Sequence, residues 1–342
     1  MTPRLRTLLA AAFAALALTG CADDLEVADR RAGPLVAEVV VEGFEFPTQL
    51  FIGAEHWYLA QLSGAENDAT GTVVRIDPND VSAEPELVLE GLDKPTGVAV
   101  FADELWVMER RRLTRGPLDG STREVVVDEM AFNGRSQGTL TVDGERLLFN
   151  TSGSLRSIED SNSSPMNSSG VLWSVDASGT IAPVASGFKH AYAHARGADG
   201  TLWSTEMTDG TFDGSPAEDE VVAVVEGRDH GWPRCVGNNR PVVERDANEA
   251  TCAVVPESQA LFDAGATPTS IVVAPWNDHE LLVSLWNRGE IVSVPIEPQL
   301  TPAAGAVIYA GIERPQHLTL DGDRLLLVDF LGGRIVELAR AT

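Results

Sequence analysis

From residue 35 onward, short apolar runs rich in Val, Ile, Leu and Trp alternate with polar turns. Runs such as residues 35–41 (LVAEVVV) and 71–76 (GTVVRI) have the length and composition of β-strands. Turn signals such as Asp143-Gly144 and Asp321-Gly322 separate the runs. No long stretch shows the periodicity of an amphipathic helix. The pattern therefore predicts an all-β protein.

One unit recurs six times along this part of the chain. A polar turn, often with proline, leads into an apolar strand, which is followed by a Leu-Trp-Val or Leu-Leu-Val strand and a Gly-led strand. The copies start at Pro47, Pro95, Arg135, Lys189, Pro268 and Pro315. A repeat of about 45 residues that supplies four antiparallel strands is typical of a propeller blade. We predict a six-bladed β-propeller over residues 35–342, closed by pairing of residues 35–41 with the last blade. Two unrelated β-domains would not predict six similar units.

The fourth copy is much longer than the others, which predicts an insertion at about 207–266. This segment contains Cys235 and Cys252, the two cysteines that remain when Cys21 is set aside. An even pair in a secreted protein predicts a disulfide, with two buried free thiols as the alternative.

The N-terminus has the pattern of a lipoprotein signal. Arg4 and Arg6 precede an apolar run at residues 8–18, which is too short to span a bilayer and is followed by Leu-Thr-Gly-Cys. We predict a signal peptide at 1–20, a lipidated Cys21 and a polar tether at 21–34; the alternative is an ordinary cleaved signal. The chain would then be extracytoplasmic and held in the cell envelope by lipid, and Ala22 after the cysteine favours the outer membrane, facing the periplasm or the cell surface.

Charge narrows the range of partners. Lys and Arg number 25 and Asp and Glu number 51, for a net charge of −26. So acidic a chain is not expected to bind nucleic acid, and its contact with the membrane is expected through the lipid anchor only.

Cationic residues gather in the turns that lead into the innermost strands, at the mouth of the central channel. The chain has two lysines, Lys94 and Lys189, and both belong to this set with Arg135, His190 and Arg314. A cationic mouth in an acidic protein favours a small anionic ligand or a sugar-like substrate there. Ion pairs with nearby acids are the alternative interpretation.

An acidic segment follows the central strand of the fourth copy. Glu206 and Asp209 begin it, and four further carboxylates follow by residue 220. Carboxylates spaced by Gly and Ser can bind calcium through hard oxygen ligands, although the EF-hand spacing is absent. A solvated acidic loop is the alternative.

Several motifs between residues 171 and 288 resemble one family. They are residues 176–179 (DASG) with 185–190 (ASGFKH), 202–206 (LWSTE), 219–220 (DE) with 227–235 (GRDHGWPRC), and 284–288 (SLWNR). In this order they resemble the soluble glucose/sorbosone dehydrogenases, six-bladed propellers that use pyrroloquinoline quinone (PQQ) with calcium.

The resemblance implies roles for particular residues. PQQ would contact Lys94, Arg135, Lys189, Tyr192 and Arg314, and calcium would lie near Glu206 and Asp209. The catalytic base of the family is a histidine in the third-blade turn. Here Arg135 holds that position, and arginine cannot act as a base at ordinary pH. His190 is then the candidate base.

The sequence thus indicates an extracytoplasmic lipoprotein that resembles PQQ-dependent sugar or alcohol dehydrogenases but has a degenerate active site. Whether it is an enzyme stays open at this point. One alternative is a non-catalytic envelope propeller that binds a carbohydrate, a peptide or a protein through the same face. Another is a calcium-dependent lactonase, which requires Glu, Asn and Asp around one ion in the channel.

Overall fold

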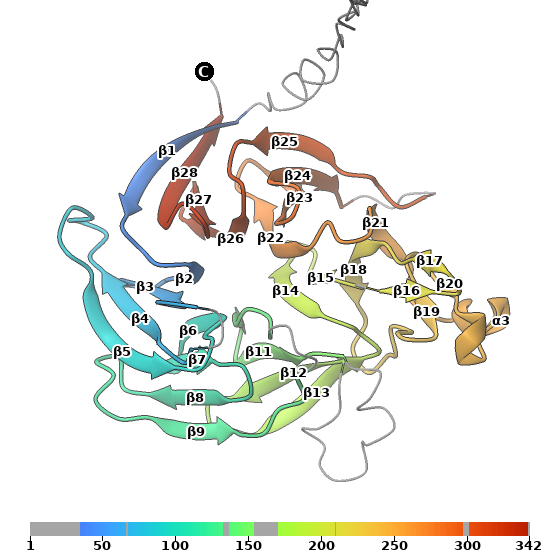
Figure 1. Ribbon diagram of the computed structural model, residues 1–342, viewed down its shortest axis with the longest axis horizontal. Helices are drawn as coiled ribbons and strands as arrows, with labels where there is room; N and C mark the ends of the chain where they lie inside the picture. The colour runs from blue at the N-terminus through green and yellow to red at the C-terminus, as the bar shows by residue number, and fades with distance from the viewer. Residues whose placement is uncertain are drawn as a thin grey trace, which may run out of the picture.

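Six four-stranded antiparallel sheets surround a central axis in the computed structural model of the protein (Figure 1). The structure describes residues 35–65, 68–132, 137–153, 170–208, 210–296 and 301–340. The predicted six-bladed β-propeller is confirmed. The predicted signal peptide, Cys21 and the tether lie outside the described residues. No helix among the described residues is long and apolar enough to cross a membrane.

The first three blades are built from consecutive strands, with the innermost strand first. Blade 1 consists of β2 (Pro47–Ile52), β3 (Trp57–Gln61), β4 (Gly71–Ile76) and β5 (Glu86–Leu92). Blade 2 consists of β6 (Gly97–Phe101), β7 (Glu104–Met108), β8 (Leu113–Gly116) and β9 (Glu124–Val127). Blade 3 consists of β10 (Thr141–Asp143), β11 (Arg146–Thr151), β12 (Val171–Asp176) and β13 (Ile181–Ser186).

The last three blades follow the same order, with one interruption and one borrowed strand. Blade 4 consists of β14 (Ala191–Arg196), β15 (Leu202–Glu206), β18 (Asp219–Val224) and β21 (Ser258–Phe262). Blade 5 consists of β22 (Pro268–Ala274), β23 (Asn277–Leu285), β24 (Glu290–Pro295) and β25 (Ala306–Ala310). Blade 6 consists of β26 (Pro315–Asp321), β27 (Arg324–Asp329) and β28 (Arg334–Arg340), with β1 (Leu35–Glu42) as its outer strand.

The ring closes as the sequence predicted. Strand β1 pairs antiparallel with β28, from Leu35 opposite Arg340 to Glu42 opposite Arg334. The strand at the beginning of the described chain thereby completes the blade at its end (Figure 1). This pairing holds the first and last blades together without a covalent bond.

Among the described residues, the core of the six blades consists of six layers, one between each pair of neighbouring blades. Successive residues of a strand point to opposite faces of its sheet, so each blade contributes to two layers. In β3, for example, Trp57 and Leu59 pack against blade 6, whereas Tyr58 and Ala60 pack against blade 2. Strands buried on both faces explain the nearly continuous apolar runs of the sequence.

A threonine latch joins several neighbouring blades near the axis. The second residue of the innermost segment is threonine in four blades, and its Oγ1 donates to a main-chain carbonyl of the next blade. The bonds run from Thr48 to Pro95 (2.9 Å), from Thr96 to Gly138 (3.1 Å), from Thr139 to Tyr192 (3.2 Å) and from Thr269 to Pro315 (3.1 Å). The threonine of each Pro-Thr pair in the repeat therefore bonds its own blade to the next one.

Replacing Thr269 by valine removes one latch while it preserves the side-chain shape. We expect the free energy of unfolding to fall by about 1 kcal/mol, because a buried carbonyl loses its donor. Denaturant unfolding measures the change. Thr122→Val, at an exposed position, is the matched control. Equal stability of the two variants would contradict a structural role for the latch.

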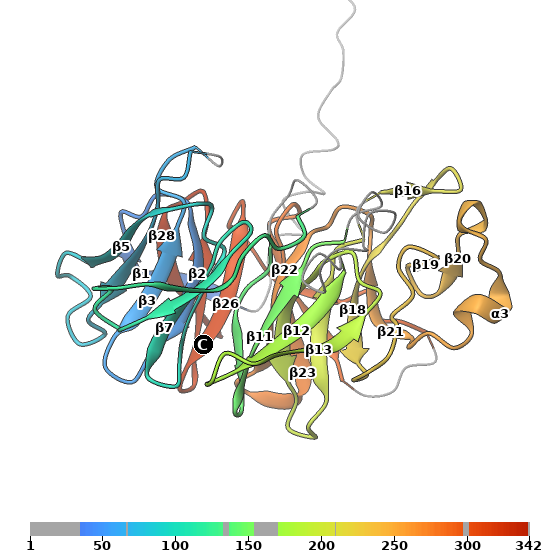
Figure 2. The ribbon, with the colours of Figure 1, turned by 90° about the horizontal axis from the view of Figure 1, so that it is seen from below.

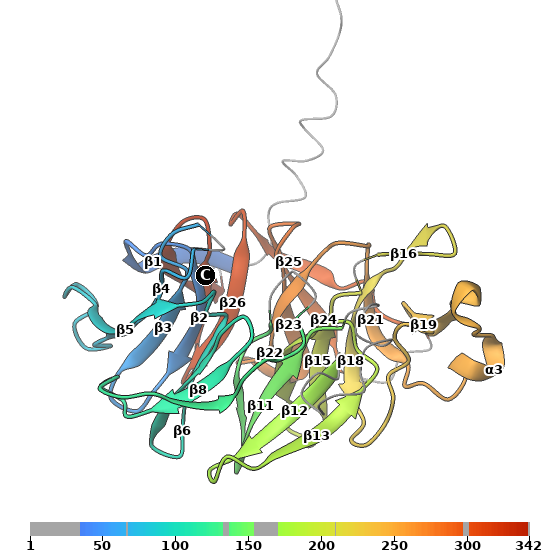
Figure 3. The ribbon, with the colours of Figure 1, turned by 60° about the horizontal axis from the view of Figure 1, so that its bottom comes forward.

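The chain leaves blade 4 in two places within the predicted insertion at 207–266, which also contains the blade strands β18 and β21. The first excursion carries the hairpin β16 (Thr211–Phe212) and β17 (Ser215–Pro216). The second carries β19 (Cys235–Val236), β20 (Arg240–Pro241), the 3-10 helix η2 (Val243–Arg245) and the short helix α3 (Glu249–Cys252). Both project from the side of the propeller (Figures 2 and 3).

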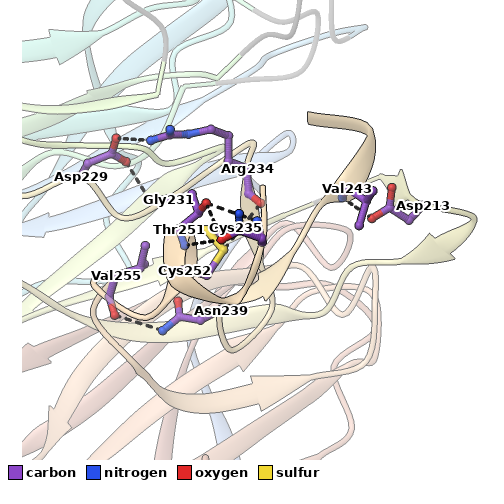
Figure 4. Close-up of a disulfide and its surroundings, with 11 residues drawn as sticks. Asp213, Asp229, Gly231, Arg234, Cys235, Asn239, Val243, Thr251, Cys252 and Val255 are labelled. Atoms are coloured by element: carbon purple, nitrogen blue, oxygen red, sulfur yellow. Dashed lines mark hydrogen bonds and ion pairs between the residues drawn. A yellow bond between two sulfur atoms is a disulfide. The ribbon is translucent and has the colours of Figure 1, made fainter. Parts of the chain in front are cut away.

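A disulfide joins Cys235 to Cys252 in the second excursion, with 5.7 Å between the Cα atoms, which confirms the predicted pair (Figure 4). The segment continues toward the propeller, where Trp232 N donates to Gly187 O (2.9 Å) and His230 N donates to Ser186 O (2.8 Å). The disulfide therefore braces a segment that contacts the turn before β14.

Loss of this disulfide should destabilise the protein. For a closed loop with a sequence separation of 17 residues, the chain-entropy model gives a loss of roughly 3 kcal/mol. We expect the double variant Cys235→Ser, Cys252→Ser to unfold at lower denaturant concentration than the oxidised protein. A reductant should shift the parent protein and leave the double variant unchanged. A reductant that shifts neither would show that the bond does not contribute to stability.

Candidate functional site

A cavity of about 690 Å³ occupies the mouth of the central channel. Its volume lies in the range of small-molecule sites. The lining residues come from the beginnings of the innermost strands and from the loops around them: Phe46, Thr48, Leu62, Gly64, Ala65, Lys94, Thr96, His190, Tyr192, Met207, Asp219, Gly265, Thr267, Thr269, Trp286, Asn287, Gln316 and Phe330. Five of the six blades therefore contribute to the described wall.

The predicted cationic residues are only partly brought together. Lys94 lines the cavity and its residue is 6% exposed. Lys189 is not among the described lining residues, and its Nζ lies 5.7 Å from the ring centroid of Trp232. Arg314 is not among the described lining residues either, and its guanidinium lies 4.5 Å from the ring centroid of Trp286. Lys94 is thus the cation that the described structure places on the cavity surface.

His190 and Tyr192 both line the cavity, from the beginning of blade 4. Main-chain N–H groups before β14 are held by a carboxylate, because His190 N donates to both carboxyl oxygens of Glu206 at 3.1 and 3.2 Å, and Lys189 N donates to Oε1. This contact fixes the turn that carries the candidate base. His190 is therefore placed where a ligand in the cavity would meet it.

Two other histidines of the innermost strands do not line the cavity. Burial lowers the pKa of His194 to about 4 and that of His317 to about 3. Both are therefore neutral at pH 7. Neither is placed to exchange a proton with a ligand in the cavity.

Aromatic rings from three blades form one side of the cavity. The rings of Phe46 and Phe330 have centroids 5.3 Å apart, and those of Phe330 and Trp286 are 5.9 Å apart. We call Phe46, Trp286 and Phe330 the aromatic wall. Trp286 lines the cavity. Trp232 packs with Val236 and Val242 in the excursion instead.

A second group of polar residues lies beside the cavity, where strands β15 and β18 meet. Glu206 and Glu220 are directly opposite in the pairing of these strands. Together with Thr208 they line a small enclosed space of about 10 Å³, which is room for one water-sized group. Asp219 faces the main cavity, and its carboxylate accepts from Thr208 N (2.9 Å) and Thr267 N (2.8 Å).

The environment of Glu206 and Glu220 disfavours their charged forms. Burial raises the pKa of Glu206 well above its ordinary value, and the charges of Glu220 and Asp219 add to this, against the lowering effect of the main-chain N–H donors. Burial likewise raises the pKa of Glu220 to about 7, although a hydrogen bond from Ser258 lowers it. A cation between these side chains would remove the penalty.

Three side chains that line the small space carry oxygen donors of the kind that a hard cation such as calcium prefers, among mostly apolar and aromatic neighbours. Two carboxylates and the Thr208 hydroxyl line the small space, and Thr208 Oγ1 is buried without a hydrogen-bond partner among the described residues. Within the same residues, no three His, Cys, Asp or Glu side chains converge as a metal-binding group. Asp209, the second predicted calcium ligand, lies outside the described residues, as does Arg135. Glu220 belongs to the acidic segment in which the sequence predicts a calcium site, whereas Thr208 was not predicted from the sequence.

Comparison with known proteins finds similar folds among solved structures. No protein-family model matches the chain, and no curated protein sequence matches it. The calcium structure of a Trichoderma reesei protein from Carbohydrate-Active Enzymes Family AA12 is similar over 91% of this chain and 96% of its own, with a TM-score of 0.74 and 16% identity. The PQQ-bound aldose sugar dehydrogenase of Streptomyces coelicolor is similar over 90% and 99%, with a TM-score of 0.68 and 16% identity.

Lactone-hydrolysing propellers are similar as well. A gluconolactonase from Xanthomonas campestris is similar over 92% of this chain and 93% of its own, with a TM-score of 0.56 and 15% identity. The structural neighbours thus include PQQ-dependent sugar dehydrogenases, the proteins that the motifs at 171–288 resemble. At these identities the likeness establishes the shared six-bladed fold.

Proposed function

We propose that the protein is an extracytoplasmic lipoprotein whose cavity binds PQQ, and that it resembles PQQ-dependent sugar and alcohol dehydrogenases with a degenerate active site. The observation that carries the proposal is the cavity itself, which brings Lys94, His190 and Tyr192 to one surface beside a buried carboxylate pair. The structural likeness to a PQQ-bound aldose sugar dehydrogenase supports it.

Each residue has a role that follows from its place. Lys94 attracts a carboxylate of the cofactor, because a buried ammonium gains most from an anionic partner. Glu206, Glu220 and Thr208 would supply oxygen ligands for calcium. Asp209, a ligand implied by the resemblance alone, lies outside the described residues. Bound PQQ would supply the acceptor for a hydride from the carbon that bears the substrate hydroxyl. His190 would take the proton of that hydroxyl through its imidazole.

Titration of the purified mature protein with PQQ, in the presence of calcium, tests the proposal. We expect quenching of tryptophan fluorescence, because Trp286 lines the cavity, and slow dye-coupled oxidation of one or more aldoses. Binding with turnover supports a dehydrogenase. Binding without turnover supports a cofactor-binding propeller whose site has lost activity. Absence of binding by the folded protein would overturn the proposal.

A non-catalytic binding propeller is the second candidate, and two observations favour it. The segment 132–140 contains no histidine, so the position of the family's base is occupied by another residue. The aromatic wall offers an apolar face to a ring-shaped ligand. A lactonase fits less well, because Asp219 is the one acidic residue among the described lining residues and its carboxylate accepts two main-chain N–H bonds.

The lipid anchor is a separate proposal with its own test. In bacterial cells that express the full chain, Cys21→Ser should move the protein from the membrane fraction to the soluble fraction, because the acyl chains have no attachment site. Immunoblots of fractionated cells measure the distribution. Cys235→Ser, which alters a cysteine of the propeller, should leave it at the membrane. A Cys21→Ser protein that stays with the membrane would show that another feature holds it there.

A further inference from the structure

Two blades depart from the threonine latch. Its position is occupied by threonine in blades 1, 2, 3 and 5, but by Tyr192 in blade 4 and by Gln316 in blade 6. These are the two largest side chains of the set. The repeat has therefore been changed at two blades that are not neighbours, since blade 5 lies between them (Figure 1).

The two exceptional side chains meet at the cavity. Gln316 Nε2 donates to Tyr192 Oη at 3.1 Å, and both residues line the cavity while each is 5% exposed. The contact joins blades 4 and 6, which are not neighbours in the ring. Neighbouring blades 5 and 6 have their own bonds, from Thr269 Oγ1 to Pro315 O and from Leu318 N to Ser270 Oγ (2.8 Å). Construction of the ring therefore does not account for this pair.

The amide of Gln316 has hydrogen-bonding capacity left for a ligand. Gln316 Oε1 accepts no hydrogen bond within the described chain, although the other end of the amide is bonded. Reversal of the amide would let Tyr192 donate to Oε1 and would leave Nε2 facing the cavity. In either arrangement one polar atom of a buried amide faces the cavity. Gln316 is not among the described residues with a buried, unpartnered side-chain atom, so the free amide atom is accessible to a ligand or water.

Neutral and charged polar groups lie at different places on the cavity wall, which also includes the carboxylate of Asp219. Gln316 and Tyr192 carry neutral polar groups, whereas Lys94 carries a cation on blade 2. A ligand with an anionic group and a carbonyl or hydroxyl edge would turn its charge toward Lys94 and its neutral edge toward the pair. The aromatic wall would pack against the face of a flat ring.

We propose that Gln316 and Tyr192 bind the neutral, carbonyl- or hydroxyl-bearing edge of the ligand and thereby set its orientation in the cavity. The inference rests on the proposed function, because PQQ, a flat quinone with carboxylates, is the probe. It assigns to Gln316 a binding role that neither the repeat pattern nor the motifs indicated.

The test is PQQ titration, followed by tryptophan fluorescence, of the parent protein, Gln316→Ala, Tyr192→Phe and the double variant. We expect each single variant to bind about fivefold to twentyfold more weakly, as for loss of one hydrogen bond to a ligand. The fold-loss of PQQ affinity in the double variant should be smaller than the product of the two single losses, because the side chains act together. Gln259→Ala, on the outer strand of blade 4, should bind as the parent does.

The outcomes separate this inference from the proposed function. Circular dichroism and denaturation midpoints first establish that each variant is folded; Tyr192→Phe keeps the ring and serves if Gln316→Ala is unstable. If the parent binds PQQ and both folded single variants bind within twofold of it, the pair does not contact the ligand and the inference is overturned while the function stands. If the folded parent does not bind PQQ, both are overturned.

Discussion

Replacement of Glu206 by alanine should lower the free energy of unfolding by about 2 kcal/mol in calcium-free buffer at pH 8. The carboxylate accepts main-chain hydrogen bonds from Lys189 and His190, and alanine leaves these buried donors without a partner. The loss is partly offset because repulsion from Glu220 also disappears. Urea unfolding measures the net change.

Replacement of Glu206 by glutamine should instead raise the free energy of unfolding in calcium-free buffer at pH 8. The amide oxygen still accepts from the turn, and the neutral side chain no longer repels Glu220. Because the folded-state pKa of Glu206 is raised, its carboxylate destabilises the folded protein increasingly as the pH rises above the unfolded value. The advantage of glutamine should therefore grow between pH 5 and pH 8 and disappear on acidification.

In the presence of calcium, the parent protein should become more stable than Glu206→Gln. If Glu206 is a ligand, calcium raises the unfolding midpoint of the parent protein and raises that of Glu206→Gln much less. Magnesium, which demands a tighter octahedral shell, is the control ion. In calcium-free buffer at pH 8, equal destabilisation by Glu206→Gln and Glu206→Ala would contradict the predicted advantage of glutamine. The negative charge would then be required even without a cation.

Replacement of Lys94 by alanine should weaken PQQ binding by tenfold to hundredfold, on the order of a lost charge-assisted hydrogen bond. Lys94 lines the cavity and is almost fully buried, so an anionic ligand bound there would lie against its side chain. Added salt should weaken the parent's binding only modestly, because buried charges are screened less than exposed ones. Fluorescence titration gives the affinity.

The chain provides a matched control in its other lysine. Lys189 carries the same charge, but its ammonium lies over Trp232 and outside the described cavity wall. Lys189→Ala should therefore cost much less affinity than Lys94→Ala. Equal losses would indicate a general attraction by positive charge at the mouth, and a larger loss for Lys189 would reverse the assignment of the two residues.

The sequence predicted those parts of the fold that repeat. The Pro-led turns and apolar strands recur from blade to blade, so the copies starting at Pro47, Pro268 and Pro315 coincide with the first residues of β2, β22 and β26. Pairing of residues 35–41 with the last blade follows from ring closure, and the paired cysteines follow from their number and compartment. Features that repeat along the chain can be recognised from the sequence alone.

The parts of the site that the sequence did not reveal depend on contacts between distant blades. Gln316 meets Tyr192 across 124 positions of sequence, and the aromatic wall joins loops of blades 1, 5 and 6. Nothing local in the chain marks such contacts. The departure from threonine at the latch position is the signal that was present, but its meaning required the inter-blade hydrogen bonds. Likewise, cationic character alone did not separate Lys94 from Lys189.

The most direct test of PQQ binding in the central cavity is calorimetric titration of PQQ into the mature protein, with calcium and with a chelator. We predict one site per chain with micromolar or tighter affinity, weakened by the chelator and by Lys94→Ala. A folded protein that takes up no PQQ with calcium present would contradict this prediction, and would leave a propeller whose cavity serves another ligand.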